Sequence, residues 1–115
     1  MTPQEFDVIV TKRIENIKKV LASKGQEYGS ADRLYNIKRA YAIERSTPQK
    51  ALCGMLLKHL GSVLDLVEGK LEATEAMVNE KVGDMINYLI LLEAIFEEQR
   101  EIERHHCYVT NQTKI

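Results

Sequence analysis

The chain has 115 residues, a net charge of −1 and 44% hydrophobic residues, as expected for one globular domain with its own core. No apolar run approaches the roughly 18 residues of a membrane span, and the near-neutral charge argues against a broad basic surface for DNA or RNA. The opening MTPQEFDVIV lacks the segments of a secretion signal, and two cysteines are too few for a disulfide framework. We therefore expect a cytoplasmic protein without a direct nucleic-acid partner.

Two helices are predicted in the first part of the chain. Thr2-Pro3 places a capping residue before a proline at the first helical position, which is a common helix start. Up to Gly25, apolar residues recur at helical spacing, namely Phe6, Ile9, Ile14, Ile17 and Leu21. Ser30 can cap a second helix, which carries Leu34, Ile37 and Tyr41.

Two longer helices are predicted in the second part. Thr47-Pro48 repeats the first start, and this helix is expected to stop near Gly69. Thr74 can cap the fourth helix, which the polar run EEQREIERHH extends as a solvated segment. The main apolar stripes are Leu52, Leu56, Leu60, Val63 and Val67 on the third helix, and Val78, Val82, Met85, Leu89, Leu92 and Phe96 on the fourth.

The fold class follows from this order of elements. No alternating strand pattern is present, so we predict a single all-α domain over residues 1–104, followed by a C-terminal tail over residues 105–115. Because only GKLEAT separates the third and fourth helices, they are expected to form an antiparallel hairpin at the centre of a four-helix, bundle-like domain.

Each helix of this hairpin also carries a line of polar residues opposite its main apolar stripe. The lines are Lys58, Ser62, Asp65 and Glu68 on the third helix, and Glu80, Asp84 and Asn87, with Tyr88 beside them, on the fourth. A solvated face would look like this. However, Met77, Leu91 and Ile95 interleave with the second line, which suits a cleft or a subunit contact better. We favour the cleft.

Such a cleft would bring together Asp65, Glu68, Glu80 and Asp84. Crowded carboxylates repel one another unless a cation joins them, and hard oxygen ligands suit Mg²⁺ or Mn²⁺. Lys58 would add a positive charge for a phosphate chain. The alternative is that Asp65 and Glu68 only pair with Lys70 or Lys81 on the surface.

Three motifs follow one another along residues 24 to 96, namely Glu27-Tyr28-Gly29, Lys58 and Asp84-x-x-Asn87-Tyr88. In these motifs and their order the segment resembles the nucleotide-modification-associated domain proteins common in phages, which are related to the MazG-like all-α nucleoside-triphosphate pyrophosphohydrolases. This resemblance implies a homodimer or homotetramer that holds Mg²⁺ on Glu-x-x-Glu and Glu-x-x-Asp motifs, where water attacks a phosphate and pyrophosphate is released. Here the pairs read Asp65-x-x-Glu68 and Glu80-x-x-x-Asp84, and both spacings keep the two acids on one helical face.

The joint KGQEYGSADRLYN between the first two helices is placed to cover a nucleotide lying along the hairpin. Lys24 and Arg33 could meet phosphates, and Tyr28 could stack on a base or hold a ribose hydroxyl. The alternatives are that Tyr28 packs beneath the joint and that Arg33 is an ordinary surface charge.

The leading hypothesis is a phage-type or prophage-type protein that binds a nucleoside triphosphate with Mg²⁺ and hydrolyses it. Its expected metal ligands are Asp65, Glu68, Glu80 and Asp84, with Glu80 also orienting the attacking water. Its expected substrate contacts are Lys24, Tyr28, Arg33, Lys58, Asn87 and Tyr88. The alternative hypothesis is a non-catalytic helical oligomer whose interleaved face is a subunit contact.

Overall fold

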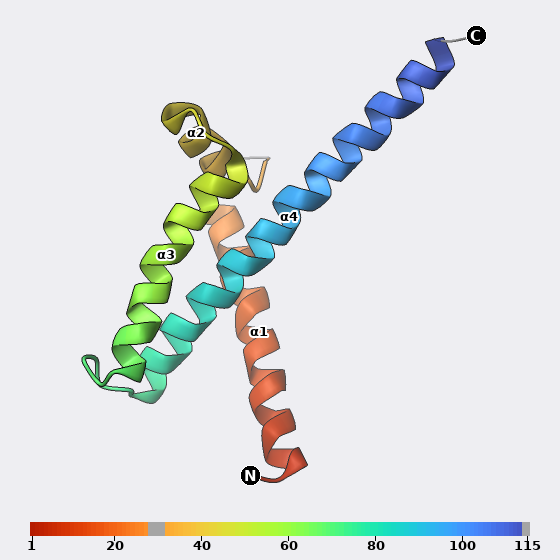
Figure 1. Ribbon diagram of the computed structural model, residues 1–115. Helices are drawn as coiled ribbons and strands as arrows, with labels where there is room; N and C mark the ends of the chain where they lie inside the picture. Colours follow the sequence, from red (N-terminus) through yellow and green to blue (C-terminus); the bar gives the residue numbers. More distant parts are fainter. Residues whose placement is uncertain (28–31, 114–115) are drawn as a thin grey trace.

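The computed structural model describes residues 1–27 and 32–113, and every regular element in these ranges is a helix (Figure 1). The elements are α1 (Pro3–Glu27), α2 (Tyr35–Glu44), α3 (Pro48–Val67) and α4 (Glu75–Thr113). The all-α prediction is therefore confirmed. Within the described ranges, we find no helix that combines the length and the apolar character of a membrane span.

Threonine caps begin three of these helices, as predicted. In α1, Thr2 Oγ1 accepts a hydrogen bond from Glu5 N at 3.1 Å, and the Glu5 carboxylate accepts one from Thr2 N at 2.8 Å. Thr47 Oγ1 accepts from Lys50 N at 3.2 Å, and Thr74 Oγ1 accepts from Met77 N at 3.1 Å. Each cap satisfies a backbone donor that the first helical turn leaves free.

The second helix begins later than a cap at Ser30 would place it. Ser30 lies outside the described residues, and α2 starts at Tyr35 with Leu34 as an N-cap that makes no side-chain bond. Asp32 instead accepts a hydrogen bond from Leu34 N at 3.0 Å. Lys38 Nζ lies 2.7 Å from Asp32 Oδ2 and 2.6 Å from Glu98 Oε1, so this lysine ties the start of α2 to α4.

Helix α4 has 39 residues and is the longest element of the chain. The predicted solvated extension over EEQREIERHH is helical. The helix continues to Thr113 and so passes through most of the segment that we expected to be a tail. Position 104 therefore lies inside a continuous helix.

The core lies where α2, α3 and α4 meet. Its buried residues are Leu34 and Ile37 around the start of α2, Leu52 on α3 and Ile95 on α4. Helix α3 packs along the first half of α4, and residues 68–74 join these two helices (Figure 1). The middle of α1 crosses the N-terminal part of α4, where Arg13 and Asn16 contact Asn79. None of the described side chains of α1 belongs to this core.

The buried side of α4 differs from the predicted one. Ile95 is 3% exposed and Asn87 is 6% exposed, whereas Leu89 and Phe96 of the expected apolar stripe are 49% and 46% exposed. The prediction is confirmed only in part, since Leu92 of the expected stripe does pack against the core. Leu89 and Phe96 are exposed because α4 has apolar residues on two sides, and the other helices cover only one of them. Helix α1 shows the same feature, since Phe6, Ile9 and Ile14 are all about half exposed.

Candidate functional site

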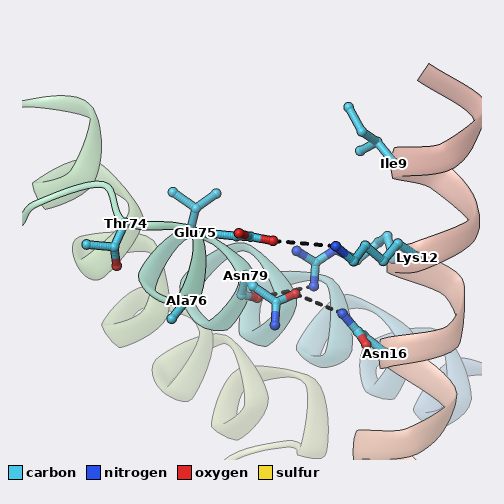
Figure 2. Close-up of a pocket in the computed structure, with 9 residues that line it drawn as sticks. Ile9, Lys12, Asn16, Thr74, Glu75, Ala76 and Asn79 are labelled. Atoms are coloured by element: carbon cyan, nitrogen blue, oxygen red, sulfur yellow. Dashed lines mark hydrogen bonds and ion pairs between the residues drawn. The ribbon is translucent and has the colours of Figure 1, made fainter. Parts of the chain in front are cut away.

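An open groove lies in the angle between the N-terminal parts of α1 and α4. Its volume is about 890 Å³, and Lys12, Arg13 and Asn16 line it from α1. Figure 2 shows Lys12 and Asn16 pointing across the groove toward Glu75 and Asn79 of α4. Ile9 and Val78 add apolar surface to the same walls. The groove therefore combines cationic, amide and apolar groups within a volume that suits a small-molecule ligand.

Three polar contacts cross the groove and fix α1 against α4. Lys12 Nζ lies 3.4 Å from Glu75 Oε1, Arg13 Nη1 donates to Asn79 O at 3.2 Å, and Asn16 Nδ2 donates to Asn79 Oδ1 at 3.1 Å. Each contact is solvent-accessible, so each contributes only about 1 kcal/mol or less to stability. Together they fix the orientation of α1 relative to α4, but they contribute only a small part of the folding free energy.

The groove leads into a smaller recess of about 210 Å³. Arg13, Asn16 and Asn79 line both spaces, and the recess adds the predicted site residues Glu80, Asp84 and Asn87 from α4. These three predictions therefore meet in one place. The volume is below the roughly 300 Å³ at which typical ligand pockets begin, so the recess can hold only one part of a larger ligand.

Asn87 is the most unusual group in the recess. It is 6% exposed, and its Oδ1 has no hydrogen-bond partner within the described part of the chain. Buried polar atoms in proteins are nearly always paired, and leaving one unpaired costs about 1–3 kcal/mol. Because Oδ1 is covered by the chain, a ligand hydroxyl, an amino group or a water in the recess would supply the missing donor after a small rotation of the Asn87 side chain.

Asp84 also faces α3. Its Oδ2 lies 3.5 Å from His59 Nδ1, and the His59 ring lies against the Tyr88 ring with a centroid distance of 4.5 Å. Tyr88 packs against the core as well and is not among the residues that line the recess. Tyr88 therefore packs against the core and against His59, which in turn contacts Asp84. Of the neighbours Asn87 and Tyr88, only Asn87 lines the recess.

The third-helix residues of the predicted site lie elsewhere. Glu68 caps α3 and pairs with Lys70 at 3.0 Å, which is the surface pairing that we considered as an alternative. Lys58 is exposed on α3, and neither it nor Asp65 lines the groove or the recess. In the described residues, no three side chains of the types His, Cys, Asp and Glu come close enough to hold a metal together. This chain thus brings Glu80 and Asp84 to one recess without Asp65 and Glu68.

The residues predicted to cover a nucleotide are only partly described. Tyr28 lies outside the described residues, as does the side chain of Lys24, although its backbone belongs to α1. Arg33 is half buried just before α2.

Sequence reasoning missed the contribution of α1. Arg13, Asn16, Ile17 and Val20 recur at helical spacing and are half buried against α4. Their spacing was a usable signal, but the more regular apolar positions on α1 drew attention to another face. No model of a protein family matches the chain, and neither the curated proteins nor the solved structures give a match.

Proposed function

We propose that this protein binds a nucleoside triphosphate in the groove between α1 and α4 and hydrolyses it with the release of pyrophosphate. One observation carries the proposal: Glu80, Asp84 and Asn87, which were selected from the sequence, line the same recess. The adjoining groove of about 890 Å³ has room for the remainder of a nucleotide.

Glu80 and Asp84 are the residues that would hold Mg²⁺ or Mn²⁺. They lie four residues apart on α4, so both carboxylates are on one side of the helix. Mg²⁺ is commonly bound by one or two carboxylates together with substrate phosphates and waters, and this set meets that requirement. When bound, the cation would neutralise charge on the phosphates and lower the pKa of its water.

The chain's own residues would then have separate tasks. Glu80 is 59% exposed at its side chain and lines the recess, so it would orient a water there as a base. Asn87 would accept a hydrogen bond from a sugar hydroxyl or a bound water. His59 would hold the Asp84 carboxylate from the far side.

The test is a pyrophosphate-release assay over a panel of nucleoside and deoxynucleoside triphosphates with Mg²⁺. Glu80→Gln and Asp84→Asn should each lower the rate at least about 100-fold, as expected for loss of a general base or a metal ligand. Glu97→Gln is the matched control, because Glu97 is exposed and pairs only with Arg100 in the described structure. If the wild-type protein turns over none of these substrates, the enzymatic part of the proposal is wrong.

A second candidate function is that of a non-catalytic helical oligomer, favoured by the apolar residues that one chain leaves exposed. Phe6, Val10 and Ile14 recur every four residues on α1 and are 56%, 39% and 48% exposed. Apolar stripes of this kind usually mark interaction sites. We propose that a second copy of this chain covers the stripe, giving a homodimer or homotetramer around a central α3–α4 antiparallel hairpin.

Light scattering tests the oligomer directly. The wild-type protein should have a mass that is a multiple of 13.2 kDa, and Ile14→Glu should return it to a single chain. Glu15→Gln, at an exposed position on the opposite side of the same helix, should leave the mass unchanged. A wild-type protein that stays monomeric at high concentration excludes this candidate.

A further inference from the structure

We infer that Arg13 of α1 binds the phosphate chain of the ligand and that Gly83 of α4 provides the space for its guanidinium group. The inference rests on the proposed function for the identity of the anion as a polyphosphate. It assigns to Arg13 the phosphate-binding task that we had expected from Lys24, Arg33 and Lys58.

The contact between Arg13 and Gly83 is unusually close. A Cβ atom built on Gly83 would lie 2.7 Å from Arg13 Nη1, a distance that real Cβ atoms do not show. Gly83 is buried in the middle of a helix, where glycine costs about 1 kcal/mol relative to alanine. The close approach of Arg13 explains this glycine, because any larger side chain at position 83 would collide with the guanidinium group.

Most of the hydrogen-bonding capacity of Arg13 is unused in the described residues. A guanidinium group carries five N–H donors, and Arg13 makes one hydrogen bond, to Asn79 O at 3.2 Å. Its neighbour Lys12 is paired with Glu75. Arg13, by contrast, lines both the groove and the recess and forms no ion pair with a carboxylate of the described chain.

The charges around Arg13 indicate how an anion would enter. Glu80 and Asp84 line the recess beside it, so a bare polyphosphate would be repelled. A polyphosphate that arrives with Mg²⁺ can place the cation toward these carboxylates and its oxygens toward Arg13. Arginine suits this task because its planar group can bind two phosphate oxygens at once.

A second observation is that Asn87, which lines the recess, has a buried and unpaired Oδ1. This oxygen needs a donor, which phosphate oxygens lack but which the hydration waters of Mg²⁺ and the hydroxyls of a sugar have. Arg13 would therefore bind the anionic part of a ligand, and Asn87 would accept a hydrogen bond from a donor group of the same ligand.

Calorimetry with Mg²⁺-pyrophosphate tests the inference without a nucleoside. Arg13→Gln should weaken binding about 10- to 100-fold, the effect expected for losing a hydrogen bond to a charged group. Lys18→Gln, an exposed charge on the same helix, should bind like the wild-type protein. Arg13→Lys should recover part of the loss, because it restores the charge but not the two-pronged geometry.

Gly83→Ala separates binding from folding. A flexible arginine end can move away from the new methyl group at little cost, and alanine favours the helix, so the melting temperature should stay the same or rise. Binding of Mg²⁺-pyrophosphate should nevertheless weaken several-fold, because the guanidinium is displaced. Unchanged affinity in Gly83→Ala would overturn the role assigned to this glycine.

The remaining outcomes distinguish the inference from the proposed function. If Mg²⁺-pyrophosphate binds with this variant pattern but no nucleotide does, the nucleotide function is wrong and the role of Arg13 stands. If nucleotides bind and Arg13→Gln binds them like the wild-type protein, only the inference is wrong. A wild-type protein that binds no pyrophosphate overturns the inference directly.

Discussion

Nδ1 of His59 lies 3.5 Å from Oδ2 of Asp84, and this contact joins α3 to the recess on the other side of α4. Both side chains are about a quarter exposed. A pair at this distance near the surface contributes about 1 kcal/mol or less. The same imidazole also contacts the Tyr88 ring, at 4.5 Å between centroids, and a ring contact of this kind contributes about 0.5–1.5 kcal/mol.

Two substitutions of His59 separate these contributions. We expect His59→Phe to keep the ring contact with Tyr88 and to change the free energy of unfolding by less than about 1 kcal/mol. His59→Ala removes the ring and should cost about 1–2 kcal/mol. Urea denaturation of the three proteins gives the comparison. Equal losses in both variants would mean that the bond to Asp84, and not the ring contact, is what matters.

Lys38 provides a second measurable link, between the start of α2 and α4. It pairs with both Asp32 and Glu98, and Lys38→Met removes both ion pairs while it keeps the aliphatic stem. Because these groups are more than a third exposed, we expect a loss of only about 1 kcal/mol. Lys50→Met, on the exposed face of α3, serves as the control and should have little effect on the urea midpoint.

The effect of Lys38 should depend on pH in a defined direction. The hydrogen bond from Lys38 lowers the pKa of Asp32, and the hydrogen bonds to Asp32 and Glu98 raise the pKa of Lys38. The Asp32 contribution is therefore complete above its unfolded pKa of about 3.9 and is lost as the pH falls through the lower folded value. The Lys38 contribution is complete below about 10.4 and is lost as the pH rises through the higher folded value.

Wild type and Lys38→Met should thus differ most between about pH 5 and pH 9. Urea midpoints of both proteins at pH 3, 7 and 11 measure this window. A difference that is constant across the three pH values would show that Lys38 acts through packing of its stem.

Thr47 is the cap of α3, and its contribution can be isolated from that of its neighbour. Thr47→Ala removes the acceptor of the Lys50 N–H bond and should cost about 1 kcal/mol. Ser46→Ala is the control, because the Ser46 hydroxyl only donates to the Thr47 carbonyl at 3.4 Å. If the two variants unfold at the same denaturant concentration, the cap contributes less than its geometry indicates.

The helix starts were predictable because their causes are local. A capping threonine and its bonding partner are three residues apart, as in Thr47 and Lys50, so the sequence contains both ends of the interaction. The buried face of α4 was not predictable in this way. Both faces of this helix carry apolar residues, and only the positions of α2 and α3 decide that Ile95 is covered while Leu89 is left outside.

The candidate site was likewise predictable within one helix but not between helices. Glu80, Asp84 and Asn87 share one side of α4 by helical periodicity, and the sequence placed them together correctly. Their partner Arg13 is 67 residues away from Glu80 along the chain and reaches them only because α1 crosses α4. Periodicity within a helix carries no information about which other helix crosses it, so Arg13 could not be paired with Gly83 from spacing alone.

Asn87 offers the last prediction, in which stability and binding change in opposite directions. Its buried Oδ1 has no partner within the described residues, so Asn87→Leu, which has a similar shape, should raise the free energy of unfolding by about 1 kcal/mol. The same change should remove the rise in melting temperature that Mg²⁺-dNTP gives to the wild-type protein, because the acceptor for the ligand is gone. Urea denaturation measures the first effect and thermal melting with and without ligand the second. A less stable Asn87→Leu would mean that a bound water already satisfies this oxygen in the free protein. In that case Asn87 Oδ1 would no longer support the binding of a ligand in the recess.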